Sequence, residues 1–182
     1  MKFLGISSGI RWYEVRKMGE KFVRFEAVAP NTSIDTALNQ ISKELEIEIG
    51  NHTYELTIFD RYFFKFSDNE GTEYAEILIA WLLKNRINRL IIYSAVDNKE
   101  GAFLKCLELR CTSNGIEFCY RPEPKTIHDR YWVLKQGEKM SVVSVGTSFN
   151  GLGKKLCSVN RQSPGDAEII LNHIEEEIHN EI

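Results

Sequence analysis

The residues that could do chemistry gather in two stretches in the last third of the chain. In the first, residues 127–134, a histidine opens a predicted β-strand. Because strand side chains alternate, His128 and Arg130 share one face while Asp129 points to the other. The second, residues 145–155, is a predicted loop with hydroxyls, an amide, glycines and two lysines. Donors of this kind suit an anion, above all phosphate.

A predicted hairpin brings these two stretches together. Its two strands would turn at Gly137, so the end of the second strand returns beside the start of the first. We therefore expect His128 to lie near Ser148 and Asn150. The two strands are predicted over residues 127–135 and 140–145.

The sequence also argues against two other kinds of site. Gly146 and Gly151 have the spacing of a nucleotide-binding P-loop, but Leu152 stands where that motif requires lysine. The cysteines form no Cys-x-x-Cys pair, and their spacing fits neither a zinc site nor a dense disulfide scaffold. We expect reduced thiols, mostly in the core, and no metal or cofactor. The four cysteines are Cys106, Cys111, Cys119 and Cys157.

The elements that must position these residues alternate between strand and helix, which predicts an α/β fold with a mixed sheet flanked by helices. An N-terminal β-meander over residues 1–30 would precede a domain over residues 31–182. Ligand sites in such sheets collect where strands end, although Asp60, after one strand, is interpreted as a turn residue. Further strands are predicted over residues 54–59, 90–94, 116–120 and, at a sheet edge, 157–159, and helices over 34–45, 73–86, 97–114 and from 163 onward.

Length, charge and hydropathy bound the class of protein. The 182 residues fit one domain, and a net charge of −3 excludes a polycation that coats nucleic acid. No apolar run reaches the length of a membrane-spanning helix, and the first residues do not form a signal peptide. We expect a cytoplasmic protein that is not an integral membrane protein.

Charge is nevertheless unevenly distributed along the chain. Residues 121–161 hold eight basic residues against three acidic ones, and they include the histidine and the glycine-rich loop. Residues 163–182 hold six acidic residues and no lysine or arginine, which is typical of a solvated helix face. The basic block therefore favours an anionic ligand at the predicted site.

The order of these motifs resembles the half-motif of the phospholipase D superfamily, His-x-Lys followed by Gly-Ser-x-Asn. His128 matches the nucleophilic histidine, and Arg130 occupies the lysine position. The downstream phosphate-binding loop is matched by Gly146, Ser148 and Asn150. The likeness covers about residues 35–180 and implies a phospholipase D-like layered domain. Within that loop, Thr147, Lys154 and Lys155 are further candidate phosphate-binding residues.

The chain departs from the family pattern at three points. Arg130 replaces lysine, Lys135 stands at the position of the family's aspartate, and one half-motif is present where the family's active site needs two histidines. The His-Asp-Arg version is also similar to the C-terminal domain of MIT-domain proteins, which lacks the full catalytic motif and binds acidic membrane surfaces. Residues 58–63 are similar to the strand that opens the domain in many bacterial members.

The resemblance implies two alternative functions. The first is a degenerate module that binds a phosphate-bearing ligand (nucleic acid or an acidic lipid headgroup) or a partner protein without turnover. The second is a homodimeric, metal-independent phosphodiesterase or nuclease. In it, His128 would form a phosphohistidine, the second subunit's histidine would protonate the leaving group, and Arg130, Ser148 and Asn150 would stabilise the phosphorane. We expect a homodimer or a subunit of a larger complex.

Overall fold

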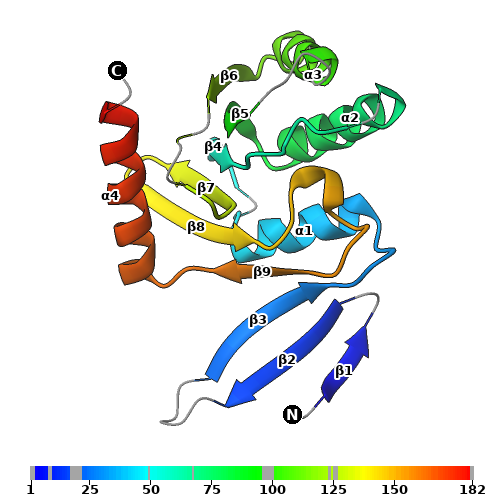
Figure 1. Ribbon diagram of the computed structural model, residues 1–182, viewed down its shortest axis with the longest axis vertical. Helices are drawn as coiled ribbons and strands as arrows, with labels where there is room; N and C mark the ends of the chain where they lie inside the picture. Colours follow the sequence, from blue (N-terminus) through cyan, green and yellow to red (C-terminus); the bar gives the residue numbers. More distant parts are fainter. Residues whose placement is uncertain are drawn as a thin grey trace.

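The computed structural model describes residues 3–7, 10–16, 22–48, 50–66, 68–95, 101–122, 124 and 127–180. These residues form the mixed α/β fold predicted from the sequence (Figure 1). The strands are β1 (Phe3–Ser7), β2 (Ile10–Arg16), β3 (Phe22–Val28), β4 (Tyr54–Phe59), β5 (Ile87–Ser94), β6 (Glu117–Pro122), β7 (Tyr131–Gln136), β8 (Lys139–Val145) and β9 (Cys157–Arg161). The helices are α1 (Ile34–Glu44), α2 (Asp68–Lys84), α3 (Gly101–Ser113) and α4 (Pro164–Asn180), with a short 3-10 turn at Phe149–Gly151.

All nine described strands belong to one sheet, in the order β1-β2-β3-β9-β8-β7-β4-β5-β6. The pairs β4–β5 and β5–β6 are parallel, and the remaining pairs are antiparallel. The predicted meander is present as β1, β2 and β3, and β3 pairs with β9 through Val28 and Cys157. The predicted boundary at residue 30 therefore does not separate two sheets.

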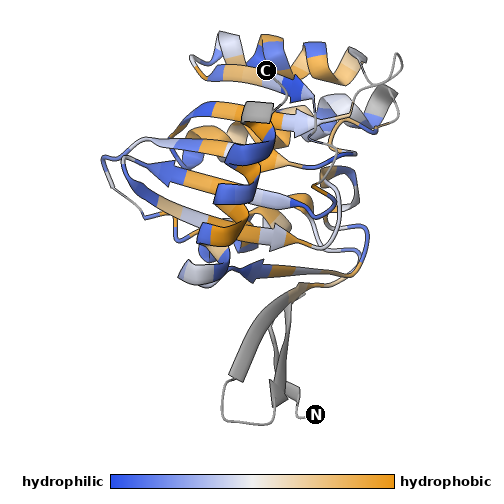
Figure 2. Cartoon of the chain, turned by 60° about the vertical axis from the view of Figure 1, so that its left-hand side comes forward, coloured by the Kyte–Doolittle hydropathy of each residue, from blue (hydrophilic) through white to orange (hydrophobic). Residues whose placement is uncertain are grey.

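Helices cover both faces of this sheet. The larger apolar cluster lies between the sheet and α1, α2 and α3, and a smaller one lies under α4 (Figure 1). Along β7, Trp132 and Leu134 enter the larger cluster while Val133 enters the smaller one, as strand alternation requires. Hydrophobic residues accordingly concentrate on the middle strands of the sheet (Figure 2). Among the described residues, none of the helices combines the length and the apolar character needed to cross a membrane.

Local signals that start helices and turns are confirmed. Ser33 caps α1, because its Oγ accepts a hydrogen bond from the Thr36 backbone N–H at 3.2 Å. Ser163 does the same for α4 through the N–H of Asp166 at 3.2 Å. The hairpin between β7 and β8 turns at Gly137, whose φ of 58° lies in the left-handed region that glycine adopts freely. These elements depend on neighbours in sequence, which is why sequence signals located them.

The prediction that a strand begins at residue 127 is wrong, because β7 begins at Tyr131. Its partner β4 ends at Phe59, directly opposite Tyr131, so one side of β7 has no partner strand before that point. On the other side the ladder reaches one residue further, since the Val145 N–H donates to the Arg130 carbonyl at 3.0 Å. His128 therefore lies in the segment that precedes the strand rather than opening it.

Two other predicted elements are corrected by packing. The strand predicted at an edge over residues 157–159 is β9, an interior strand, because β3 pairs with its outer side. The helix predicted from residue 73 begins at Asp68. Gly71, a poor helix former, lies inside it because the Phe103 ring packs there, 3.2 Å from where a Cβ would be. The predicted capping residues 97–100 lie outside the described residues.

Gly153 offers a test of how the loop between β8 and β9 is seated. Its φ is 76°, and a Cβ at this position would collide with the Thr32 carbonyl oxygen. We expect Gly153→Ala to lower the free energy of unfolding by about 1–3 kcal/mol, measured by urea denaturation. Gly165→Ala is the matched control, since Gly165 lies in α4 with no atom within 4 Å of a Cβ, and it should be neutral or slightly stabilising. Equal effects of the two substitutions would contradict this seating.

Candidate functional site

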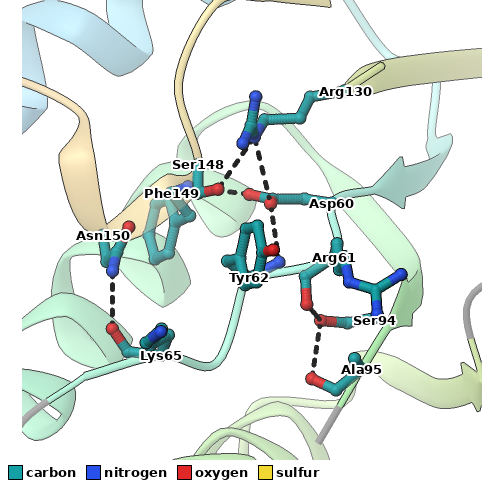
Figure 3. A network of polar contacts seen from close by, with 10 residues as sticks. All are labelled: Asp60, Arg61, Tyr62, Lys65, Ser94, Ala95, Arg130, Ser148, Phe149 and Asn150. Carbon is teal, nitrogen blue, oxygen red and sulfur yellow. Dashed lines mark hydrogen bonds and ion pairs between the residues drawn. The ribbon is translucent and has the colours of Figure 1, made fainter. Parts of the chain in front are cut away.

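The candidate site lies at the edge of the sheet where the parallel strands β4 and β5 end (Figure 3). Asp60 directly follows β4, and its backbone N–H donates to the Tyr93 carbonyl at 3.1 Å. Arg130 directly precedes β7, the antiparallel neighbour of β4. Ser148 reaches the same place from the loop after β8. Segments far apart in sequence thus meet at one edge, where open α/β sheets place their ligand sites.

Asp60 is the centre of this arrangement, with a side chain that is 1% exposed. Its Oδ1 accepts the Tyr62 backbone N–H at 3.1 Å, and its Oδ2 accepts the Phe149 backbone N–H at 2.8 Å. The Ser148 hydroxyl also donates to this carboxyl group, and Arg130 Nε lies 3.5 Å from Oδ1 (Figure 3). The carboxylate therefore joins the end of β4, the start of β7 and the loop after β8.

Ser148 bridges the two charged groups. Its Oγ accepts a hydrogen bond from Arg130 Nε at 2.8 Å, and its own proton is directed to Asp60. Ser148 is buried, whereas 28% of the Arg130 side chain is exposed. Within the described part of the chain, the two terminal nitrogens of this guanidinium make no hydrogen bond, so they remain available to a ligand.

Burial raises the pKa of the Asp60 carboxyl group above its ordinary value. The hydrogen bonds from Phe149, Ser148 and Tyr62 oppose this shift, as does the positive charge of Arg130. A titratable group under such opposed influences, placed at a strand end, is typical of functional sites.

The loop after β8 is anchored to the protein by its own polar groups. Asn150 Nδ2 donates to the Lys65 carbonyl at 2.6 Å, and Phe149 is buried with its ring stacked on Phe63 at 4.7 Å between centroids. A Cβ at Gly151 would collide with the Thr147 hydroxyl, so this glycine leaves room for a neighbour. Backbone N–H groups that already donate within the protein are those of Gly146, Phe149, Gly151, Leu152, Lys154 and Lys155.

The remaining candidate side chains differ in whether they contact other side chains of the protein. Lys154 Nζ lies 3.0 Å from Glu70 Oε1 and 5.0 Å from the centroid of the Tyr74 ring. Lys155 and His128 are both exposed, and neither bonds to another side chain in the described part of the chain. Among the described candidate residues, the side-chain groups without such a contact are thus the outer nitrogens of Arg130, the His128 imidazole and the Lys155 ammonium group.

The structure brings Arg130 and Ser148 together. The hairpin is predicted to bring His128 to Ser148 and Asn150, and among the described residues no hydrogen bond joins His128 to either of them. Sequence reasoning missed the role of Asp60, which it interpreted as a turn residue. Asp60 does accept the turn bond from Tyr62, and it also holds the site. The signal that could have located it is an acid directly after a buried strand, inside the 58–63 segment that carries the family likeness.

Comparisons with known proteins leave the family open. The chain matches no protein-family model and no curated protein. Among the described residues, no group of three or more histidine, cysteine, aspartate or glutamate side chains could hold a metal ion. Any function must therefore be argued from the site itself.

Replacing the Asp60 charge tests whether the carboxylate organises this edge. We expect Asp60→Asn to lower the free energy of unfolding by about 2–3 kcal/mol, because the amide places a donor among donors and leaves Arg130 without its counter-ion. Asp129→Asn is the control: it removes the same charge next to Arg130, but Asp129 is exposed, and among the described residues its side chain bonds to the Tyr131 hydroxyl at 3.2 Å. Urea denaturation of both variants measures the difference, and similar losses would argue against a special role for Asp60.

Proposed function

We propose that the chain is a phospholipase D-like module that binds a phosphate-bearing ligand at this edge without turning it over. The observation that carries the proposal is the setting of Arg130. Its inner nitrogen is held by Ser148 and by a carboxylate that is 1% exposed (Figure 3), while the two terminal nitrogens make no hydrogen bond to the described residues. A buried ion pair adds little to the net free energy of folding, because desolvation of the charges offsets their attraction. Its presence at a strand end therefore favours a role in ligand binding.

Phosphate is the ligand chemistry that best fits these groups. A guanidinium fixed at one side offers two outer nitrogens in one plane, and these can bind two oxygens of the same phosphate. His128 and Lys155 are exposed, and both belong to the basic block of the sequence, residues 121–161. The resemblance to phospholipase D proteins supports the same ligand class and the same layered fold.

Three features favour binding over turnover. A nucleophilic histidine needs a second group to orient it, and His128 makes no hydrogen bond to the described residues. The hydroxyl proton of Ser148 is directed to Asp60, and the amide of Asn150 holds Lys65, so both are committed within the protein. The phosphodiesterase alternative is supported by the exposure of His128, which leaves it accessible to the histidine of a second copy.

Charge variants test the phosphate site. We expect Arg130→Lys and Lys155→Glu each to weaken binding about tenfold, since one loses the two-nitrogen contact and the other reverses a charge. Two probes separate the possible ligands: a fluorescein-labelled single-stranded oligonucleotide followed by anisotropy, and phosphatidylcholine vesicles containing phosphatidylserine followed by sedimentation. Binding of either probe should also fall as salt is raised.

Lys84→Glu is the matched control for Lys155→Glu, because Lys84 is exposed at the end of α2, near the edge where β5 begins. It should leave binding unchanged; an equal loss, or no binding of either probe, would contradict the proposal. Turnover is tested with bis(p-nitrophenyl) phosphate in the presence of EDTA. We expect no release of p-nitrophenol, and a release that His128→Ala abolishes would establish the phosphodiesterase alternative instead.

A further inference from the structure

The outer edge of β6 is the feature that the proposed function leaves unexplained. β6 is the last strand in the order of the sheet, and the described residues provide no strand on its outer side (Figure 1). An edge strand presents a row of unpaired backbone N–H and C=O groups, which is a template for another strand. Natural proteins either block such edges or use them for pairing.

The side chains of β6 divide cleanly between the two faces of the sheet. Phe118 and Tyr120 pack against the larger apolar cluster, on the side of α3. Glu117, Cys119 and Arg121 lie on the opposite face, where their neighbours on β5 are Arg89, Ile91 and Tyr93. This row of side chains therefore consists of an acidic residue, a thiol and a basic residue, in that order along the strand.

This row is self-complementary in one orientation. If a second copy of β6 pairs antiparallel about Cys119, Glu117 lies opposite Arg121 of the partner subunit, and the same contact recurs across the two-fold axis. The two copies of Cys119 then face each other at the axis. A parallel pair in register would instead place acid against acid and base against base, which is unfavourable.

The charges needed for this pairing are available. Glu117 is 64% exposed, although its Oε1 already lies 3.1 Å from Arg89 Nε. Arg89 has a second partner, Glu55 Oε2 at 2.7 Å, so Glu117 is not required to neutralise it. Arg121 is exposed and makes no ion pair with the described residues. A base with no ion pair among the described residues and a shared acid, both on the same edge strand, are complementary to their own copies.

We propose that the protein forms a two-fold symmetric dimer in which two β6 strands pair antiparallel about Cys119 and continue the sheet across the subunits. The two β6 strands run in opposite directions, and in each subunit β4 and β5 run parallel to β6. The carboxyl ends of β4 and β5 in one subunit therefore lie at the opposite end of the joined sheet from those of its partner. The two Arg130 sites therefore face away from each other. Such a dimer presents two separate sites, suited to bivalent binding, and it cannot join two His128 side chains in one active site.

Cross-linking tests the position of the axis. Opposed residues of an antiparallel pair have Cα atoms about 4.5–5.5 Å apart, which is within the range of a disulfide. Treating the dilute native protein with diamide, which takes up the two thiol hydrogens, should give a covalent dimer on non-reducing gels. We expect Cys119→Ser to abolish this dimer and Cys106→Ser, which alters another half-buried thiol, to leave it. A covalent dimer that depends on Cys106, or none at all, would overturn the proposal.

Charge exchange tests the orientation, by sedimentation equilibrium of the wild type and variants. Arg121→Glu should raise the dimer dissociation constant about tenfold, because two attractive contacts become repulsive. Adding Glu117→Arg should restore the dimer, with Glu55 still neutralising Arg89. A wild type that stays monomeric at high concentration, or a double variant no better than the single one, would refute this interface. Phosphate binding measured on the same variants is a separate readout, so failure of one proposal does not imply failure of the other.

Discussion

The contact between the Asp60 carboxylate and Arg130 is the constraint on which the arrangement of this edge depends. A carboxylate that is 1% exposed loses its hydration, so its charge is tolerable only where donors replace the lost water. Here the hydrogen-bond donors come from the residue two positions on and from the loop after β8, and the opposite charge comes from Arg130 at the start of β7. Since each of these groups belongs to a different segment, satisfying one buried charge also fixes three pieces of backbone relative to one another.

This constraint divides the predicted phosphate-binding residues into two groups. Ser148 and Asn150 hold the loop, and Gly151 and Gly153 leave room for Thr147 and Thr32. The glycine-rich character of the loop is therefore explained by close packing and by backbone conformation. Among the described candidate residues, the outer nitrogens of Arg130, the His128 imidazole and the Lys155 ammonium group make no contact with another described side chain. A guanidinium held in this way suits the binding of an anion, which is the role proposed above.

The sheet places this site and the β6 edge in a definite relation. The site lies where β4 and β5 end, and β6 runs parallel to both. Any partner that adds to β6 in the antiparallel sense therefore directs its own site the opposite way. For this reason the two proposals fit one another: a module that binds without turnover gains from two separate sites, whereas a two-histidine enzyme needs another interface.

The sequence by itself determined the features that rest on neighbours along the chain. The serine caps at 33 and 163, the turn at Gly137 and the opposed faces of β7 follow from local conformational preferences and from strand alternation. What only the tertiary structure decided is which segments meet. Asp60 is bonded to Phe149, 89 positions away; β7 starts where β4 ends; and β9 is interior because β3 lies beside it. These outcomes depend on burial and pairing between distant segments, for which a single sequence carries no local signal.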